Sequence, residues 1–167
     1  MRASTYQQYN EIFEEMANRH PSIQFFHEID EDEIISGQFR SKIRFPAFIL
    51  EYPALGFNDN RTNVNQVFPA AFAVLKQLTG KQLGHAPSIR AIMNETNIIM
   101  LDLISYLREK RRTDGNFYLE TNLVKLDKVG PVFDACYGWR CELTFQSWVD
   151  LNFKPEEWTV YNPEKWK

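Results

Sequence analysis

Histidines are the residues of this sequence with the chemistry to bind a metal ion or to move a proton in catalysis. His20, His27 and His85 are scattered, and each lacks a histidine or cysteine at close spacing. A zinc site needs three or four converging ligands, which usually include closely spaced pairs. The sequence therefore predicts surface or loop positions for the three histidines and no metal site.

The two cysteines lie five residues apart, at Cys136 and Cys141, in a segment that alternates in the manner of a strand. An odd spacing places their side chains on opposite faces, so they cannot bond to each other or share a metal. Cysteines of this kind are usually small buried apolar residues. We expect two half-buried thiols without a chemical role, in a reducing compartment.

Two charged runs stand out, EIDEDE at Glu28–Glu33 and REKRR at Arg108–Arg112. Carboxylates in series suit a divalent cation, but the acidic run lacks the alternating ligands and central glycine of a calcium loop. Both runs fit helix ends whose charge complements the helix dipole. The alternative is an electrostatic docking edge for a partner.

Motifs for catalysis are missing from the sequence. It contains no phosphate-binding glycine loop, no dinucleotide fingerprint and no nucleophile elbow around a serine. We therefore predict no enzyme and no cofactor. One alternative stays open, a small cytoplasmic enzyme whose aspartates, glutamates and histidines converge from scattered positions on a pocket.

Composition narrows the class of protein further. The 167 residues are 44% apolar and 14% aromatic, which excludes global disorder. A net charge of −3 argues against a protein that binds nucleic acid through bulk charge. Apolar windows such as Phe45–Leu50 are far shorter than the roughly 20 residues of a membrane span. The first residues lack the apolar stretch of a signal peptide, so we expect no export.

Helices and strands must position any binding surface. A first helix is predicted from Ser4, whose capping box is completed by Gln7, to the residues before Pro21. Its apolar stripe consists of Tyr6, Tyr9, Ile12, Phe13 and Met16. A short second helix is predicted between Asp30 and Arg44, since it would begin acidic and end basic.

Two strands are predicted next. Pro46–Pro53 is an apolar run too short for a core helix, and Gly56–Arg61 has turn residues. The segment from Thr62 to about Leu78 is a longer strand, apolar on both sides and thus covered in part on both faces. Pro69 within it requires an edge or a bulge. A helix over Pro69–Leu78 is the alternative.

The second half of the chain contains a long helix and two strands. After a loop at Thr79–Pro87, the helix is predicted from Ser88 to about Arg112. Strands follow at Phe117–Asp127 and Tyr137–Phe145, joined by a turn at Lys128–Pro131. The helix buries Ile89, Ile92, Met93, Ile99, Met100, Leu103 and Leu107, and the last strand aligns Tyr137, Trp139, Cys141, Leu143 and Phe145 on one face.

Together these elements predict an α+β fold. We expect a small mixed, mainly antiparallel sheet of about four strands, packed against the long helix and the N-terminal helix. Residues 1–150 would form this single domain. Residues 151–167 would form an extended strap whose aromatic residues anchor it to the body or to another subunit.

The element order, together with two local stretches, resembles a known family. Phe45–Glu51 reads as a first strand that begins through a proline, and Tyr137–Phe145 reads as the last strand. In its element order and in these two stretches, the chain resembles the small α+β fold of bacteriophage tail-terminator and tail-completion proteins. The resemblance covers most of residues 1–150.

The resemblance implies an assembly role in the virion, in the tail or neck, with assembly in the host cytoplasm. Such proteins form a ring, usually a hexamer, on the last ring of the tail tube. They stop its growth and present a surface to a neck or head-completion protein. It implies no catalysis, no membrane and no sequence-specific nucleic acid, although DNA passes through the ring. A head-completion or connector-ring adaptor of the neck is the alternative.

A closed ring requires two unlike lateral surfaces on each protomer, and two end surfaces. Aromatic residues and arginines are enriched at the cores of interfaces. The end contacts are expected on the polar face of the sheet and on loops 54–62 and 79–86. The interface candidates are Tyr6, Tyr9, Phe57, Arg61, Lys81, Arg108, Arg111, Arg112, Trp158 and Trp166. The alternative for the tyrosines and tryptophans is that they close the core of their own domain.

Overall fold

A computed structural model describes residues 6–29, 42–59, 64–80, 84–113, 118–119, 124–133 and 135–149. These residues form two helices and one sheet of seven strands, which confirms the α+β prediction and corrects the expected strand number of about four. In chain order the elements are α1 (Tyr6–Arg19), β1 (Phe25–Ile29), β2 (Ala47–Glu51), β3 (Gly56–Asp59), β4 (Val64–Gln77), α3 (Ala86–Thr113), β5 (Tyr118–Leu119), β6 (Lys125–Val132) and β7 (Cys136–Val149).

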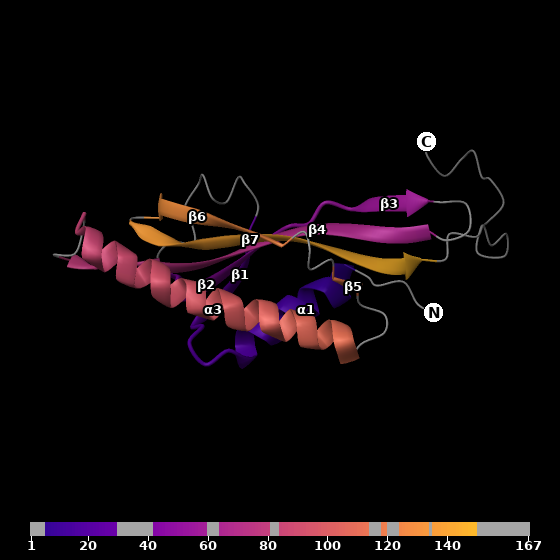
Figure 1. The fold of residues 1–167 in the computed structure, drawn as a ribbon, viewed down its shortest axis with the longest axis horizontal. Coiled ribbons are helices and arrows are strands. Elements are labelled where there is room, and N and C mark those ends of the chain that lie inside the picture. Colours follow the sequence, from indigo (N-terminus) through magenta and orange to yellow (C-terminus); the bar gives the residue numbers. More distant parts are fainter. Residues whose placement is uncertain are drawn as a thin grey trace, which may run out of the picture.

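The sheet is built around two long strands. β4 and β7 have 14 residues each and pair antiparallel over their whole length, from Val64↔Val149 to Gln77↔Cys136. The main path is β1-β2-β4-β7-β5, with β3 also on β4 and β6 also on β7. Only the β1·β2 pair is parallel among the pairs that the structure describes. Figure 1 shows the two long strands running through the molecule.

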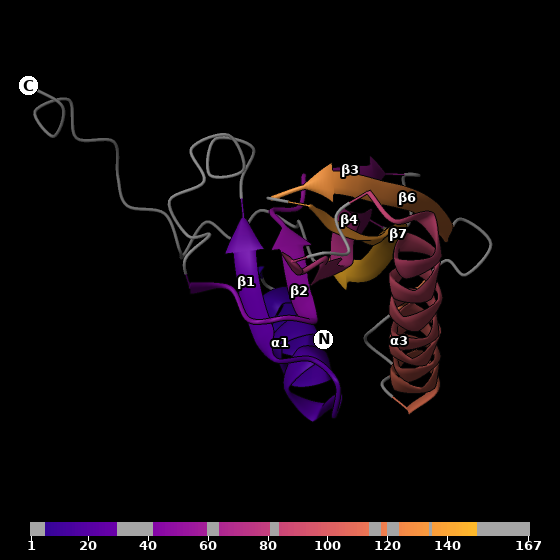
Figure 2. The same cartoon turned by 90° about the vertical axis from the view of Figure 1, so that its left-hand side faces the viewer.

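Both helices cover the same face of the sheet, as the end-on view in Figure 2 shows. Helical spacing in α1 buries Tyr9, Phe13 and Met16 of the predicted apolar stripe, and Ala17 beside them. Tyr6 is exposed and Ile12 half-buried, which corrects the two other members of that stripe. Phe13 is the centre of an aromatic cluster, because its ring lies 6.2, 5.6 and 5.5 Å from the rings of Phe48, Phe72 and Phe145. α3 buries Ile92, Thr96, Ile99, Met100, Leu103 and Leu107.

A second, smaller core lies on the other face of the sheet. Alternation places Phe72 and Val74 in the main core, while Ala73 and Leu75 pack in the second. The prediction that this strand is covered in part on both faces is therefore confirmed. The cysteines separate in the same way, with Cys141 in the main core and Cys136 in the second, and neither forms a disulfide.

Two prolines interrupt the ladder along one edge of β4. β2 pairs with Phe72–Leu75 and β3 pairs with Val64–Val67, so residues 68–71 face neither strand. Continuing the β2 register would place Pro53 opposite Pro69, and neither proline can donate an N–H to the ladder. The β3 register is offset by one residue from that of β2. Pro69 therefore lies at a local edge and a register shift, which confirms what its sequence position required.

Several sequence predictions are corrected. Gly56–Asp59 was expected to be a turn but is β3, because the edge of β4 offers it a pairing partner. Lys128–Pro131 lies within β6, and the chain reverses instead near Phe133 and Ala135, both of which have positive φ. Phe117–Asp127 is divided between β5 and β6, which pair with different parts of β7.

The helix boundaries and the first strand also differ in detail. α3 begins at Ala86, ahead of the expected Ser88, and the Ser88 hydroxyl lies 2.9 Å from the His85 ring nitrogen. The acidic run begins inside β1, a strand that the sequence patterns did not predict. The rest of that run and most of the predicted short helix lie outside the described residues.

Gly138 lies opposite Leu75 in the pairing of β7 with β4. A Cβ at this position would lie 1.8 Å from the Val74 carbonyl oxygen and 2.9 Å from its carbonyl carbon. No side chain fits such a gap, so glycine is required at this point of the ladder. Among the described helices, none combines the length and apolarity needed to cross a membrane.

Candidate functional site

The sheet extends past the helices that cover it. We call the extension the arm, and define it as β3 with Val64–Val67 of β4 and Gln146–Val149 of β7. Figure 1 shows these three strand segments projecting beyond the ends of α1 and α3. The arm therefore continues both faces of the sheet, including the face that the helices cover in the body.

Register decides which arm residues continue the helix-covered face. Phe68, Phe72 and Val74 belong to the main core, so Gln66 and Val64 lie on the same face of β4. Phe57 is directly opposite Gln66 and therefore shares that face. Leu55 lies in the segment just before β3, two residues from Phe57.

Exposed apolar residues lie on this face of the arm and just before it in the chain. Phe57 is 59% and Leu55 54% exposed, whereas Phe68 in the adjacent body is 2% exposed. Val64 is half-buried. We call Leu55, Phe57 and Val64 the arm patch. Exposed apolar side chains that continue a protein core mark a surface suited to contact with another chain.

α1 begins at the body side of the arm and separates the two candidate tyrosines. Tyr9 stacks on Phe68 with ring centroids 5.9 Å apart and is 5% exposed. Burial raises its pKa well above the ordinary value. Tyr9 is thus a core residue and does not offer a lateral contact. Tyr6 is 39% exposed, and its hydroxyl lies 3.4 Å from Glu28.

A charged cluster lies on the opposite face of the sheet, next to the proline break. Arg140 binds Glu51 through two hydrogen bonds of 2.6 and 2.7 Å and also donates to Glu142. Hydrogen bonding to Glu51 is the largest cause that raises the Arg140 pKa above its ordinary value, so this guanidinium stays charged. Lys125 lies 2.6 Å from Asp127 and 4.0 Å from Glu142.

The cluster borders an open depression of about 320 Å³. Its floor is the part of β4 around Pro69 and Ala71 that neither β2 nor β3 pairs with. Glu51, Tyr52, Arg140, Glu142 and Thr144 also line it. The charged groups are already paired with one another, so the depression presents salt-bridged side chains. It is the polar face that the sequence assigned to end contacts.

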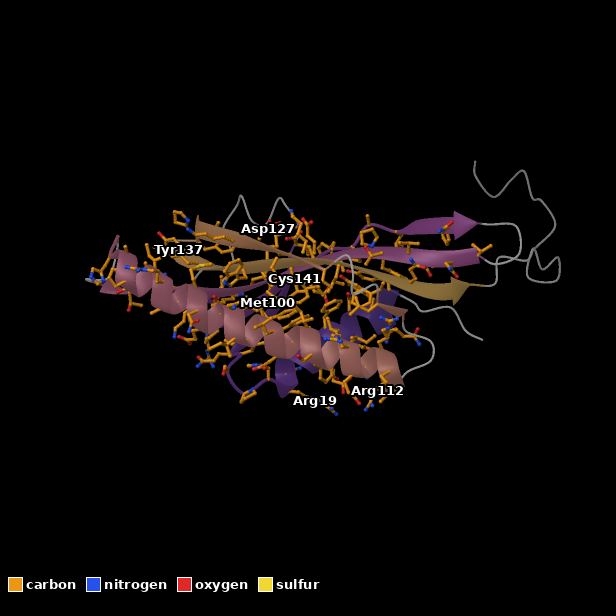
Figure 3. All side chains as sticks on the ribbon, viewed as in Figure 1. Arg19, Met100, Arg112, Asp127, Tyr137 and Cys141 are labelled. Atoms are coloured by element: carbon orange, nitrogen blue, oxygen red, sulfur yellow. The ribbon has the colours of Figure 1, made fainter. Side chains whose placement is uncertain are left out.

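The basic run forms the last turn of α3, where it complements the helix dipole. Arg112 is paired with Glu109 at 2.8 Å, and Lys110 binds Glu15 of α1 at 3.1 Å. Arg108 is exposed and Arg111 is half-buried. Figure 3 shows Arg19 and Arg112 along the outer edge of the helix layer, on the far side from Asp127. The dipole interpretation fits this placement, and docking by the same residues stays a prediction.

A second exposed apolar pair lies on α3. Ile98 is 54% and Leu101 50% exposed, three residues apart on the outward face of the helix. The helical pattern of the sequence did not single out this pair. The arm patch and this helix pair lie on different elements and differ in shape, one on a sheet face and one on a helix ridge.

Metal binding and thiol chemistry find no support in the described part of the chain. It contains no group of three or more histidines, cysteines, aspartates or glutamates that could hold a metal ion. His20 lies 3.6 Å from Asp102, and His85 caps α3. Burial raises the pKa of Cys141 to about 12, which keeps its thiol protonated near neutral pH.

The interface candidates lie in different parts of the structure. Phe57 lies in the arm and Tyr6 beside it, and Leu55 belongs to the loop 54–62 that the sequence assigned to end contacts. Arg61, Lys81, Trp158 and Trp166 lie outside the described residues. Sequence reasoning did not name Tyr52 and Glu51. Alternation along the last strand predicts that Arg140 and Glu142 share a face, but no sequence signal links Arg140 to Glu51, 89 positions away.

Comparison with protein-family models and with curated proteins finds no match to this chain.

Proposed function

We propose that this chain is a structural virion protein that forms a ring at the head-proximal end of a phage tail. The ring, expected to contain six copies, ends polymerisation of the tail tube and joins the tail to the neck. Its partners are further copies of the chain, the tail-tube protein, and a neck or head-completion protein. DNA passes through the ring without sequence-specific contacts.

The arm patch is the observation that carries this proposal. Phe57 is more than half exposed on a sheet face that is apolar and buried in the body, and Leu55, just before β3, is more than half exposed as well. Keeping such side chains in water is unfavourable, by roughly 1.5–3 kcal/mol for a side chain of this size. A surface of this kind is explained when another polypeptide covers it in the assembled state.

A closed ring would explain why one protomer carries two different exposed apolar surfaces. A heterologous contact joins one surface of a protomer to a different surface of the next, and it closes when the rotation between them divides a full turn. The arm patch and the pair Ile98 and Leu101 are two unlike exposed apolar surfaces, and a ring protomer carries several unlike contact surfaces. The element order of the chain, which resembles that of tail-terminator proteins, supports the same assignment.

The polar face around Arg140 suits an end contact with tube or neck. Its charges are paired within the protomer, so a partner can cover it without leaving an unpaired buried charge. Electrostatic complementarity there would set orientation and rate of docking more than affinity.

Deleting the gene tests the terminator function directly. Without a terminator the tube continues to polymerise, so electron micrographs should show tails of irregular and excessive length. Supplying the intact gene from a plasmid should restore uniform tails. Tails of normal length in the deletion strain would contradict the proposal.

A further inference from the structure

Residues 150–167 begin where the arm ends. β7 runs outward along the arm and finishes at Val149, opposite Val64, which in turn pairs with Asp59 of β3. The chain therefore leaves the sheet at the tip of the arm, beside the arm patch. Any segment that follows Val149 is delivered to this part of the molecule.

The sequence of this segment is aromatic. It reads DLNFKPEEWTVYNPEKWK, which places four aromatic residues among 18. They are Phe153, Trp158, Tyr161 and Trp166. Aromatic side chains bury roughly 150–250 Å² each, so four of them offer on the order of 600–1,000 Å² of contact area.

A stable interface buries about 800 Å² on each partner. Four aromatic side chains can supply that area on the side of the segment, and the arm patch is the apolar centre of the surface that receives them. The segment and the arm patch are also two different surfaces, so a contact between them is heterologous, as a closed ring requires.

We propose that residues 150–167 of one copy of this chain dock on the arm patch of the next copy. The aromatic side chains of the segment cover Leu55, Phe57 and Val64, and each copy gives one segment and receives one. At about 3.3 Å per residue, 18 residues of extended chain can span up to about 60 Å. This inference rests on the proposed ring and names the contact that closes it.

Complementation between two full-length variants tests the exchange. The arm variant, Phe57→Asp, keeps its own segment but places a charge on the patch. The segment variant, Trp158→Ser with Trp166→Ser, keeps its arm but loses two of the four aromatic residues. We expect each variant alone to remain monomeric in light scattering at concentrations where the parent chain assembles, with association at least about 10-fold weaker.

Mixing the two variants gives the decisive result. The intact segment of the arm variant can dock on the intact arm of the segment variant, and the same exchange cannot continue to a third chain. We therefore expect a 1:1 complex of two chains. No complex on mixing, with assembly of the parent chain lost in both variants, would mean that each segment covers the arm of its own chain, and would overturn the inference.

Asn58→Asp is the matched control for the arm variant. It places the same charge on the same strand, but Asn58 lies on the opposite face of β3 from Phe57. It should assemble like the parent chain, and circular dichroism should show all variants folded. Assembly of the parent chain and of both main variants alike would overturn the exchange but leave the ring intact. A parent chain that stays monomeric beside its tube and neck partners would contradict the proposed function itself.

Discussion

The body and the arm share β4 and β7 but differ in what covers the sheet. In the body, the helix-facing side chains of β4 and β7 are buried, with Phe68 at 2% and Phe145 at 3% exposure. In the arm, the same face of the sheet carries Phe57 of β3 at 59% exposure. The difference arises because α1 covers the body and does not extend over the arm.

The contrast separates stability from binding. Burial in the body contributes to the free energy of unfolding of the single chain, whereas the arm patch contributes nothing to it until a second polypeptide covers it. Substitutions in the body should therefore unfold the protein without a specific effect on assembly. Substitutions in the arm should leave the fold intact and weaken assembly.

Glycine substitutions give the largest expected contrast. Gly138→Ala in the body forces a Cβ into the Val74 carbonyl oxygen and should cost about 4 kcal/mol of unfolding free energy or prevent folding. Gly56→Ala in the arm meets no atom nearer than 4.0 Å and should change stability by about 0.5 kcal/mol or less. Urea denaturation measures both. Equal losses would show that arm and body pack alike.

Phenylalanine truncations test the same contrast through apolar burial. Phe13→Ala removes a fully buried ring from the aromatic cluster and should cost about 3–5 kcal/mol. Phe57→Ala should cost about 0.5 kcal/mol or less in the monomer and reduce assembly. The midpoints of chemical denaturation, taken below the association concentration, provide the comparison. A large loss for Phe57→Ala would place that ring inside the folded monomer.

The charged cluster at the junction of body and arm should contribute a smaller amount. Arg140→Met leaves Glu51 and Glu142 without their shared partner and should cost about 1–2 kcal/mol, since the group is partly exposed. Arg112→Met, whose side chain is 78% exposed, should cost nearly nothing. Thermal denaturation of the two variants side by side measures the difference. Similar losses would mean that the cluster does not stabilise the junction.

Removing one hydroxyl should stabilise the body slightly. The Tyr9 hydroxyl is buried and has no hydrogen-bond partner among the described residues. Tyr9→Phe removes this desolvated group and should raise the unfolding free energy by up to about 1 kcal/mol. A loss of stability beyond about 1 kcal/mol would instead reveal a partner for the hydroxyl.

The smallest expected effect depends on pH. Hydrogen bonding to Lys110 lowers the pKa of Glu15 below its ordinary value of 4.5. Stabilisation by this pair is therefore present above pH 4.5 and is lost as the pH falls through the lower pKa of the folded state. Lys110→Met should remove about 0.5 kcal/mol at pH 7 and less at pH 3. If the variant loses the same unfolding free energy at both pH values, the loss comes from packing of the lysine side chain and not from the ion pair.

Local patterns were sufficient to predict the body. Helical spacing located α1 and α3, and alternation along β7 located its two faces, so that Cys136 and Cys141 were placed in different environments. These signals are local because each element buries its own repeating stripe. Most of the main core follows from them, while Ile89, Met93 and Tyr6 of the predicted stripes are not fully buried.

The arm and the charged cluster depend on partners distant in sequence. β3 reads GFND, which is turn chemistry by propensity, and it is a strand because the edge of β4 is available. The residue type of Phe57 was enough to make it an interface candidate. The face of the sheet on which it lies depends on its pairing with Gln66, which the sequence does not show. Arg140 and Glu51 meet only because β2 and β7 both flank β4.

The mass of the intact chain in solution tests the central claim most directly. Native mass spectrometry or light scattering over a range of concentrations should give a single closed species that is a whole multiple of the 19.7 kDa chain, and Phe57→Asp should reduce it to the monomer. A chain that remains at 19.7 kDa at every concentration, with its tube and neck partners present, would contradict the account.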